Sequence, residues 1–155
     1  MADLLKDKVC IITGSARGIG KEIAILFAEE GATVIVNDAS VGEADRWIEA
    51  SPLKDSFDAV YFDITDPEVV RKNVMSIKKK YGHIDVLVNN AGTEFNELIG
   101  MISRENMEKM FRVNVYGTIE MLQTVSRVMS RNSNGGSIIT VSYTHLRAHE
   151  TLSDL

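Results

Sequence analysis

The chain reads TGSARGIG at residues 13–20, directly after the apolar run VCII at residues 9–12. A continuous apolar and β-branched run suits a strand that is buried on both faces of a parallel sheet. Glycines after such a strand allow a tight turn, and the helix that follows offers free N–H groups to a pyrophosphate. The segment therefore predicts a strand–turn–helix unit that binds a dinucleotide. A glycine-rich turn without a ligand is the alternative.

The glycine spacing separates this unit from two other phosphate loops. It is Gly-x-x-x-Gly-x-Gly rather than Gly-x-Gly-x-x-Gly, the commoner dinucleotide fingerprint. A Walker loop is excluded, because Ser15 stands where its first glycine belongs and Glu22 stands where its magnesium-binding serine or threonine belongs.

Strand-like runs alternate with amphipathic helical patterns along the rest of the chain. We predict strands at residues 9–13, 33–37, 59–62, 84–88 and 137–141. We predict helices at about residues 18–30, 43–50, 66–81 and 103–131, with Asp66 as N-cap, Pro67 at the first helical position and Gly82 after the third helix. This alternation predicts an α/β fold, a Rossmann-type doubly wound parallel sheet with helices on both faces. Because ligands bind beyond the carboxyl ends of such strands, we expect function in the loops that follow them.

The composition of the chain excludes several classes of partner. With 155 residues, of which 45% are hydrophobic and 25% charged, the chain has the make-up of an ordinary globular domain. Its net charge of -5 argues against a nucleic-acid partner, and no apolar stretch is long enough to span a bilayer. The single Cys10 lies in the first apolar run, so we expect a buried thiol and a reducing, cytoplasmic location.

Asp38 ends the second predicted strand, about 20 residues past the glycines, where dinucleotide-binding units carry an acid that binds the adenosine ribose. A carboxylate there accepts hydrogen bonds from the two ribose hydroxyls and repels a 2′-phosphate. Arg17 acts in the opposite direction, since a cation in the glycine loop can meet that phosphate. We therefore expect NAD as the preferred cofactor, with NADP possible. A solvated turn aspartate is the alternative for Asp38.

Further polar and small residues follow the later strands in a fixed order. Asp63 and Ile64 follow the third strand, the run NNAG at residues 89–92 follows the fourth, and Asn114 lies in the long predicted helix. Together with the glycine loop and Asp38, this set resembles the short-chain dehydrogenase/reductase family, in particular its 3-oxoacyl-carrier-protein reductases, over about residues 6–141. The resemblance implies an oxidoreductase that transfers a hydride between a nicotinamide cofactor and a secondary alcohol or ketone, in a homo-oligomeric parent, a dimer or tetramer.

The resemblance also implies the cofactor-binding residues. The pyrophosphate loop matches Gly14, Gly18, Ile19 and Gly20. The residues that contact the adenine match Asp63 and Ile64, and the loop that lines the adenosine side of the cofactor matches Asn90, Ala91 and Gly92. From the residues alone, Asp63 also suits a turn or cap acid, and Asn90 also suits a brace of the sheet edge.

Asn114 matches the family's helix asparagine, which helps to hold a water in a proton relay to the catalytic lysine. An asparagine inside an apolar helical stretch is poor for helix propensity, which supports a purpose for it. A bond from its side chain to a neighbouring backbone group is the alternative.

The resemblance ends where the family carries its catalytic serine and its Tyr-x-x-x-Lys pair. Tyr143 stands at the serine position, and no lysine follows Asn114. Tyr143 and Arg147 only superficially resemble the pair, because no loop separates them from the strand and arginine is not equivalent to lysine. We expect residues 1–141 to form an incomplete dinucleotide-binding domain, truncated after the fifth strand. Residues 142–155 read as a tail outside the family, and residues 143–151 resemble translated sequencing-adaptor read-through.

The tail offers no credible metal site. His145 and His149 are four residues apart in the sequence and Glu150 follows directly. No third ligand with a supporting context accompanies the two histidines, so we expect no metal. For the chain as it stands we expect an inactive member of the family. The alternatives are a non-catalytic dinucleotide-binding module and a non-functional truncated product.

Overall fold

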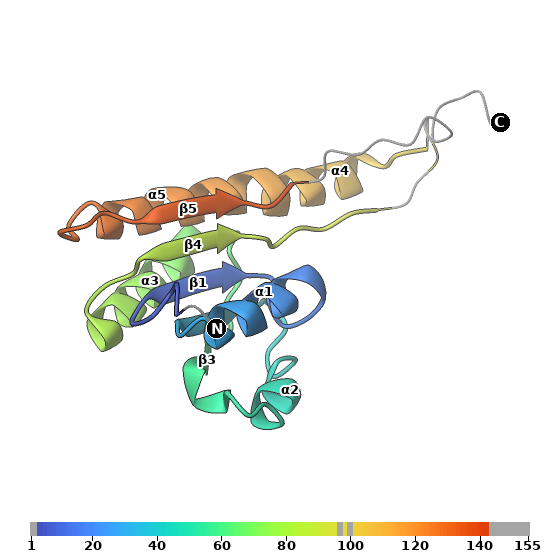
Figure 1. The fold of residues 1–155 in the computed structure, drawn as a ribbon. Helices are drawn as coiled ribbons and strands as arrows, with labels where there is room; N and C mark the ends of the chain where they lie inside the picture. Colours follow the sequence, from blue (N-terminus) through green and yellow to red (C-terminus); the bar gives the residue numbers. More distant parts are fainter. Residues whose placement is uncertain (1–2, 96–97, 99–100, 143–155) are drawn as a thin grey trace.

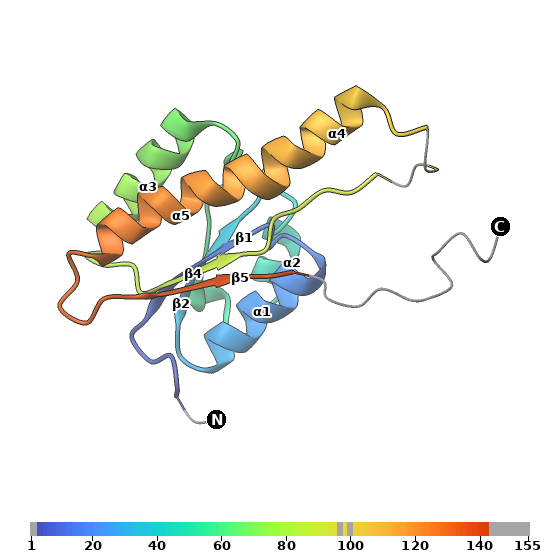
Figure 2. The same ribbon diagram turned by 90° about the horizontal axis from the view of Figure 1, so that it is seen from above.

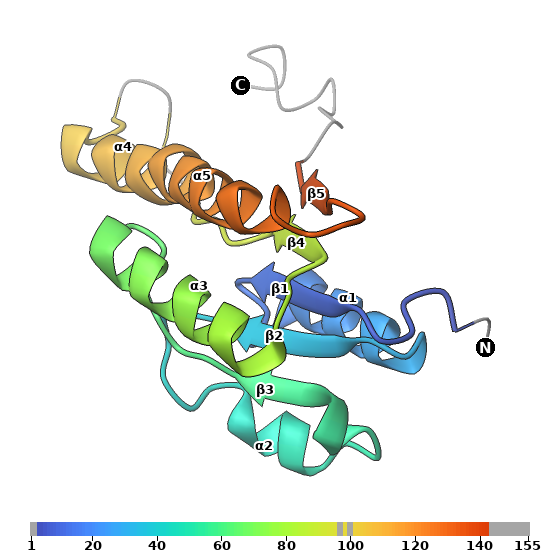
Figure 3. The ribbon, with the colours of Figure 1, turned by 90° about the vertical axis from the view of Figure 1, so that its left-hand side faces the viewer.

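The computed structural model describes residues 3–95, 98 and 101–142. Its centre is one parallel sheet of five strands in the order β3-β2-β1-β4-β5 (Figures 1 and 3). The strands are β1 (Val9–Thr13), β2 (Thr33–Asn37), β3 (Phe57–Ala59), β4 (Val86–Asn89) and β5 (Ser137–Thr140). The chain winds outward from β1 to β3 and then returns to the other side of β1, so the strand order reverses between β1 and β4. This is the predicted Rossmann-type doubly wound α/β fold.

Helices cover both faces of the sheet (Figures 2 and 3). The helical elements are α1 (Gly18–Glu29), α2 (Asp45–Glu49), the short 3-10 turn η1 (Lys54–Ser56), α3 (Pro67–Tyr81), α4 (Arg104–Phe111), the π-helical turn η2 (Arg112–Gly117) and α5 (Thr118–Met129). The helix α1 lies on one face, and α3 and α5 lie on the other. Among the described residues, no helix combines the length and the apolar character needed to cross a membrane.

Residues that alternate along the buried strands belong to two separate apolar cores, one on each face of the sheet. Ile11, Ile35 and Leu87 point toward α3 and α5, whereas Cys10 and Val34 point toward α1. All five side chains are fully buried, which explains why these strands read as continuous apolar runs. The predicted burial of the Cys10 thiol is confirmed.

The ends of α3 follow the predicted capping chemistry. The Asp66 side chain accepts hydrogen bonds from the N–H groups of Glu68 and Val69, and Pro67 occupies the first helical position. Gly82 ends the helix in the left-handed conformation, with φ of 85°. These contacts fix where the chain re-enters the sheet as β4.

Two predicted strands are displaced in the structure. The third strand was predicted at residues 59–62, whereas its regular pairing with β2 covers Phe57–Ala59. Beyond it the N–H groups of Val60 and Phe62 still donate to the carbonyls of Val36 and Asp38, but the carbonyls of Val60 and Phe62 accept bonds from the Asn37 side-chain amide. The fourth strand was predicted at residues 84–88 and begins at Val86 instead. At the far edge, all four residues of β5 are exposed.

The long helix predicted at residues 103–131 is not uniform. Ser103 caps its first turn, since its hydroxyl accepts a bond from the Asn106 N–H. The backbone then widens into a π-helical turn at Arg112–Gly117 before it continues as α5. Such turns are rare and are found at functional sites more often than elsewhere. This turn carries Asn114.

Candidate cofactor site

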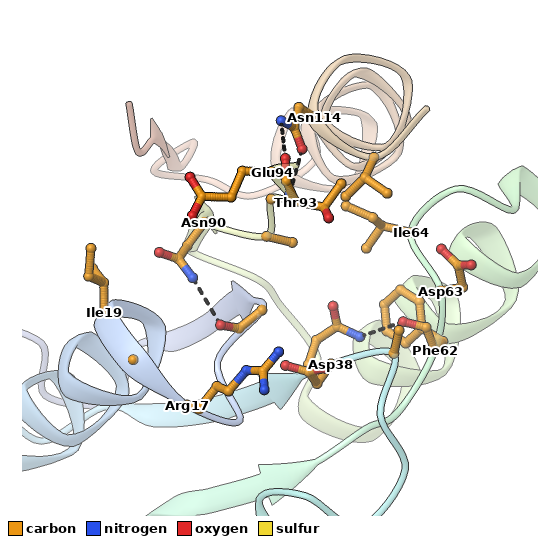
Figure 4. Close-up of a pocket in the computed structure, with 17 residues that line it drawn as sticks. Arg17, Ile19, Asp38, Phe62, Asp63, Ile64, Asn90, Thr93, Glu94 and Asn114 are labelled. Carbon is orange, nitrogen blue, oxygen red and sulfur yellow. Dashed lines mark hydrogen bonds between the residues drawn. The ribbon is translucent and has the colours of Figure 1, made fainter. Parts of the chain in front are cut away.

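A cavity of about 810 Å³ opens at the carboxyl ends of β1, β2 and β4 (Figure 4). It is bounded by the loops after these strands, by the segment after β3 and by the π-helical turn. Its lining residues are Gly14, Arg17, Gly18, Ile19, Asn37, Asp38, Ala39, Phe62, Asp63, Ile64, Asn90, Ala91, Gly92, Thr93, Glu94, Val113 and Asn114. The structure thus brings together every predicted site residue except Gly20.

The glycine loop is shaped by backbone conformation and by close packing. Gly14 and Gly18 have φ of 62° and 57°, in the left-handed region that side chains disfavour. A Cβ on Gly14 would also lie 2.7 Å from the Ala91 Cα. Gly20 lies beneath the loop, where a Cβ would press on the Gly14 carbonyl oxygen and lie 2.5 Å from the Asn90 Nδ2. Gly20 is therefore needed for packing, not for lining the cavity.

The first turn of α1 faces the cavity without a competing anion. Its N-cap residue, Arg17, makes no side-chain capping bond, and no acidic residue lies in the first turn. The N–H groups and the positive end of the helix dipole are therefore available to an external anion. Gly18 and Ile19 line the cavity at this point.

A buried hydroxyl that was not predicted from the sequence, that of Thr13, joins the two loops of the site. The Thr13 Oγ1 accepts bonds from the N–H groups of Asn90 and Ala91, both at 3.0 Å, and donates to the Val88 carbonyl at 3.4 Å. The side-chain amide of Asn90 in turn donates to the backbone carbonyls of Thr13 and Gly14, at 3.0 and 2.9 Å. The available signal was a threonine ending an otherwise apolar strand. Asn90 thus makes the bracing contacts proposed as its alternative role, at the rim of the cavity.

Asp38 is half-buried and lines the cavity. Its Oδ2 accepts a bond from the Ala16 N–H at 3.3 Å, and its Oδ1 accepts one from the Ser40 N–H at 3.0 Å. A carboxylate has about four lone-pair sites, so both oxygens keep acceptor capacity for a ligand. Figure 4 shows the Arg17 guanidinium on the same side of the cavity.

Asp63 and Ile64 have different surroundings. Asp63 is exposed, and its Oδ1 accepts a bond from the Thr65 N–H at 2.8 Å, which is the turn contact named as its alternative role. Ile64 is buried against the π-helical turn, where a Cβ on Gly117 would lie 2.7 Å from its Cγ1. Ile64 therefore links the wall of the cavity to η2.

Asn114 binds the loop after β4 through both ends of its side-chain amide. Its Oδ1 accepts a bond from the Thr93 N–H at 2.8 Å, and its Nδ2 donates to the Thr93 carbonyl at 2.9 Å. The partner is the backbone of a residue 21 positions away in the sequence, not a neighbouring backbone group of its own helix, which was the alternative. One amide N–H and one lone pair remain available for a water.

Among residues 3–95, 98 and 101–142, no group of three potential metal ligands is found. Tyr143, Arg147 and the residues considered for a metal site, His145, His149 and Glu150, lie outside the described residues.

The fold defines a Rossmann-type α/β domain with a cavity where its strand order reverses, and comparison with known proteins identifies its family. The chain belongs to the short-chain dehydrogenase family, whose model matches residues 8–149. The match extends beyond residue 141, into the segment that the sequence argument treats as a tail outside the family.

Individual relatives agree with the family assignment. The chain is 41% identical over 139 residues to the 3-oxoacyl-[acyl-carrier-protein] reductase FabG of Thermotoga maritima, covering 89% of this chain and 56% of that protein. It is 37% identical over 151 residues to the galactitol 2-dehydrogenase of Agrobacterium fabrum, covering 97% and 58%. The crystal structure of gox2181 superposes with a TM-score of 0.84 at 28% identity, over 91% of this chain and 55% of that one. The chain thus spans little more than half the length of these relatives.

Proposed function

We propose that the chain is the cofactor-binding portion of an NAD-preferring oxidoreductase that transfers a hydride between the nicotinamide cofactor and a secondary alcohol or ketone. Membership of the short-chain dehydrogenase family supports the reaction class. The two relatives named above are a reductase and a dehydrogenase, which is consistent with that chemistry. The observation that carries the proposal is the convergence of the glycine loop, Asp38 and the Asn90 loop on one cavity at the point where the strand order reverses.

The residues present fit a dinucleotide. Gly14, Gly18 and Ile19 present backbone and an uncapped helix N-terminus to the pyrophosphate. The spare acceptor capacity of Asp38 suits the two hydroxyls of the adenosine ribose, and its charge disfavours a 2′-phosphate; NADP nevertheless remains possible through Arg17. Asp63 and Ile64 take the adenine end, and Asn90, Ala91 and Gly92 take the adenosine side. When bound, the cofactor supplies the hydride chemistry, while the protein positions it.

In the full-length parent, Asn114 contributes to the proton path. Its Thr93 contacts fix the side chain at the edge of the cavity, and its spare N–H and lone pair can hold a water there. This is the relay role that the family resemblance implies. We propose a small-molecule alcohol or ketone as the substrate, a cytoplasmic location and a homo-oligomeric parent, with no nucleic-acid or membrane partner.

For this polypeptide we propose nucleotide binding without turnover. A tyrosine titrates near pH ~10 and needs a neighbouring cation to act as an acid or base near neutrality. No lysine follows Asn114 in the sequence, which favours the second candidate function, a dinucleotide-binding module without chemistry. We further propose that residues 1–141 form the dinucleotide-binding unit and that residues 142–155 are a tail outside it.

Two measurements on one purified sample test the proposal. Calorimetric titration with NAD should show weak binding, and an absorbance assay for NADH over a panel of secondary alcohols should show no turnover. Absence of NAD binding would refute the cofactor site. Turnover that disappears in Tyr143→Phe would refute the assignment of the tail and restore the Tyr143 and Arg147 pair.

A further inference from the structure

The segment that connects β2 to α2 supports the glycine loop from below. The Ala16 N–H donates to the Oδ2 of Asp38 in this segment at 3.3 Å, and the Ala16 carbonyl accepts from the Nε1 of Trp47 on α2 at 2.9 Å. Ala16 is itself buried. These contacts fix the backbone from which the side chain of the next residue, Arg17, extends.

The Arg17 side chain already has an anionic partner from the same segment. Its Nη1 lies 3.4 Å from the Glu43 Oε1. Arg17 lines the cavity and its side chain is 81% exposed, whereas the Glu43 side chain is 35% exposed and does not line the cavity. The cation available to a ligand phosphate is therefore paired from outside the site, by a residue that need not touch the ligand.

We propose that Glu43 is a specificity-determining residue that disfavours a 2′-phosphorylated cofactor by pairing with Arg17. A 2′-phosphate at the ribose would have to compete with Glu43 for the guanidinium, and it would also meet the carboxylate of Asp38. With Glu43 and Asp38 both ionised, the three side chains together carry one net negative charge. An unphosphorylated ribose needs only Asp38 and is unaffected by the pair. This inference rests on the proposed cofactor site.

The test uses the full chain and two nucleotides that differ by one phosphate, 5′-AMP and 2′,5′-ADP. Trp47 is the only tryptophan of the sequence and bonds the glycine loop, so its fluorescence reports binding. Glu43→Gln removes the charge that holds Arg17. Glu49→Gln is the matched control, because Glu49 lies on α2, pairs with Lys54 at 3.0 Å and does not line the cavity.

We expect Glu43→Gln to bind 2′,5′-ADP about 3- to 5-fold more tightly than the unmutated chain, the range that an exposed ion pair of up to about 1 kcal/mol allows. Affinity for 5′-AMP should not change, and Glu49→Gln should have neither effect. In an Arg17→Gln background, most of the gain should disappear. Raising the salt concentration should shrink the gain, because both partners are accessible to screening ions.

Each other outcome is decisive. An equal gain in Glu49→Gln, or an equal gain for 5′-AMP, would reduce the effect to net charge and overturn the role of Glu43. Unchanged affinities in Glu43→Gln, with both nucleotides still bound, would overturn this inference and leave the proposed function intact. Failure of the unmutated chain to bind either nucleotide would refute the proposed function itself, and the inference with it.

Discussion

Replacing Thr13 with valine should lower the free energy of unfolding far more than the removal of one surface polar group would. The Thr13 side chain is buried, and its hydroxyl is the acceptor for the N–H groups of Asn90 and Ala91. Valine preserves the shape but leaves both donors without this partner. A buried unsatisfied donor costs about 1–3 kcal/mol, and both groups are only partly buried, so we expect a loss of about 2–4 kcal/mol. That is a large share of the ~5–15 kcal/mol that stabilises a typical domain.

Urea denaturation followed by Trp47 fluorescence measures this loss. Thr13→Ser is the control, since it keeps the hydroxyl and removes one methyl group, which costs about 1 kcal/mol. Thr13→Val should also weaken nucleotide binding, because the loop from Asn90 onward loses its anchor. A loss below about 1 kcal/mol in Thr13→Val, or equal losses in the two variants, would show that the hydroxyl does not satisfy these donors.

Three further predictions follow from the site and the core. In the full-length parent, kcat/KM should be higher with NAD than with NADP, and Asp38→Ala should reduce the ratio of the two values. Steady-state kinetics that show an NADP preference in the unmutated enzyme would contradict this. Gly20→Ala should abolish nucleotide binding and destabilise the fold, because the added Cβ would meet the Gly14 carbonyl. In Gly18→Ala the added Cβ meets no atom within 4 Å, so backbone strain alone should lower the free energy of unfolding by about 1–2 kcal/mol. Calorimetric melting of the two variants measures both losses. Burial raises the pKa of the Cys10 thiol from 9.0 to about 12, and burial with the Asp45 hydrogen bond raises that of Tyr61 from 10.0 to about 12. The folded chain therefore keeps protons that the unfolded chain releases above pH 9.0, so the free energy of unfolding should fall as the pH rises from 9.0 toward 12. This fall should be shallower in Cys10→Ala. A free energy of unfolding that stays flat from pH 8 to 11 would refute the linkage.

The sequence was most informative where local chemistry and burial coincide. The strands β1 and β2 read as apolar runs because each is covered on both faces, and the Asp66, Pro67 and Gly82 signals for α3 are satisfied within the helix itself. The spacing of the site residues was also sufficient to predict which loops meet, because parallel strands deliver their carboxyl ends to one edge.

The failures have a common physical origin in long-range contacts. The carbonyls of Val60 and Phe62, just beyond β3, accept bonds from the Asn37 side chain, which is more than 20 residues away in the chain, and no local pattern encodes those bonds. The Thr13 hydroxyl and the Trp47 indole likewise act on residues distant in sequence. Helical periodicity also could not reveal the π-helical turn, because α4 before it and α5 after it are both regular α-helix.

That turn fixes the rotational phase of the last helix. Regular α-helix advances about 100° per residue, and a π-helical turn accommodates its residues at a wider spacing. The residues of α5 that pack on the sheet, including Met121 and Val125, are buried directly after the wide turn. Deleting one residue from Arg112–Gly117 would close the wide turn into regular α-helix and would move Asn114 away from Thr93. A family that keeps its core and this asparagine together is therefore expected to tolerate substitutions in the turn far better than changes in its length.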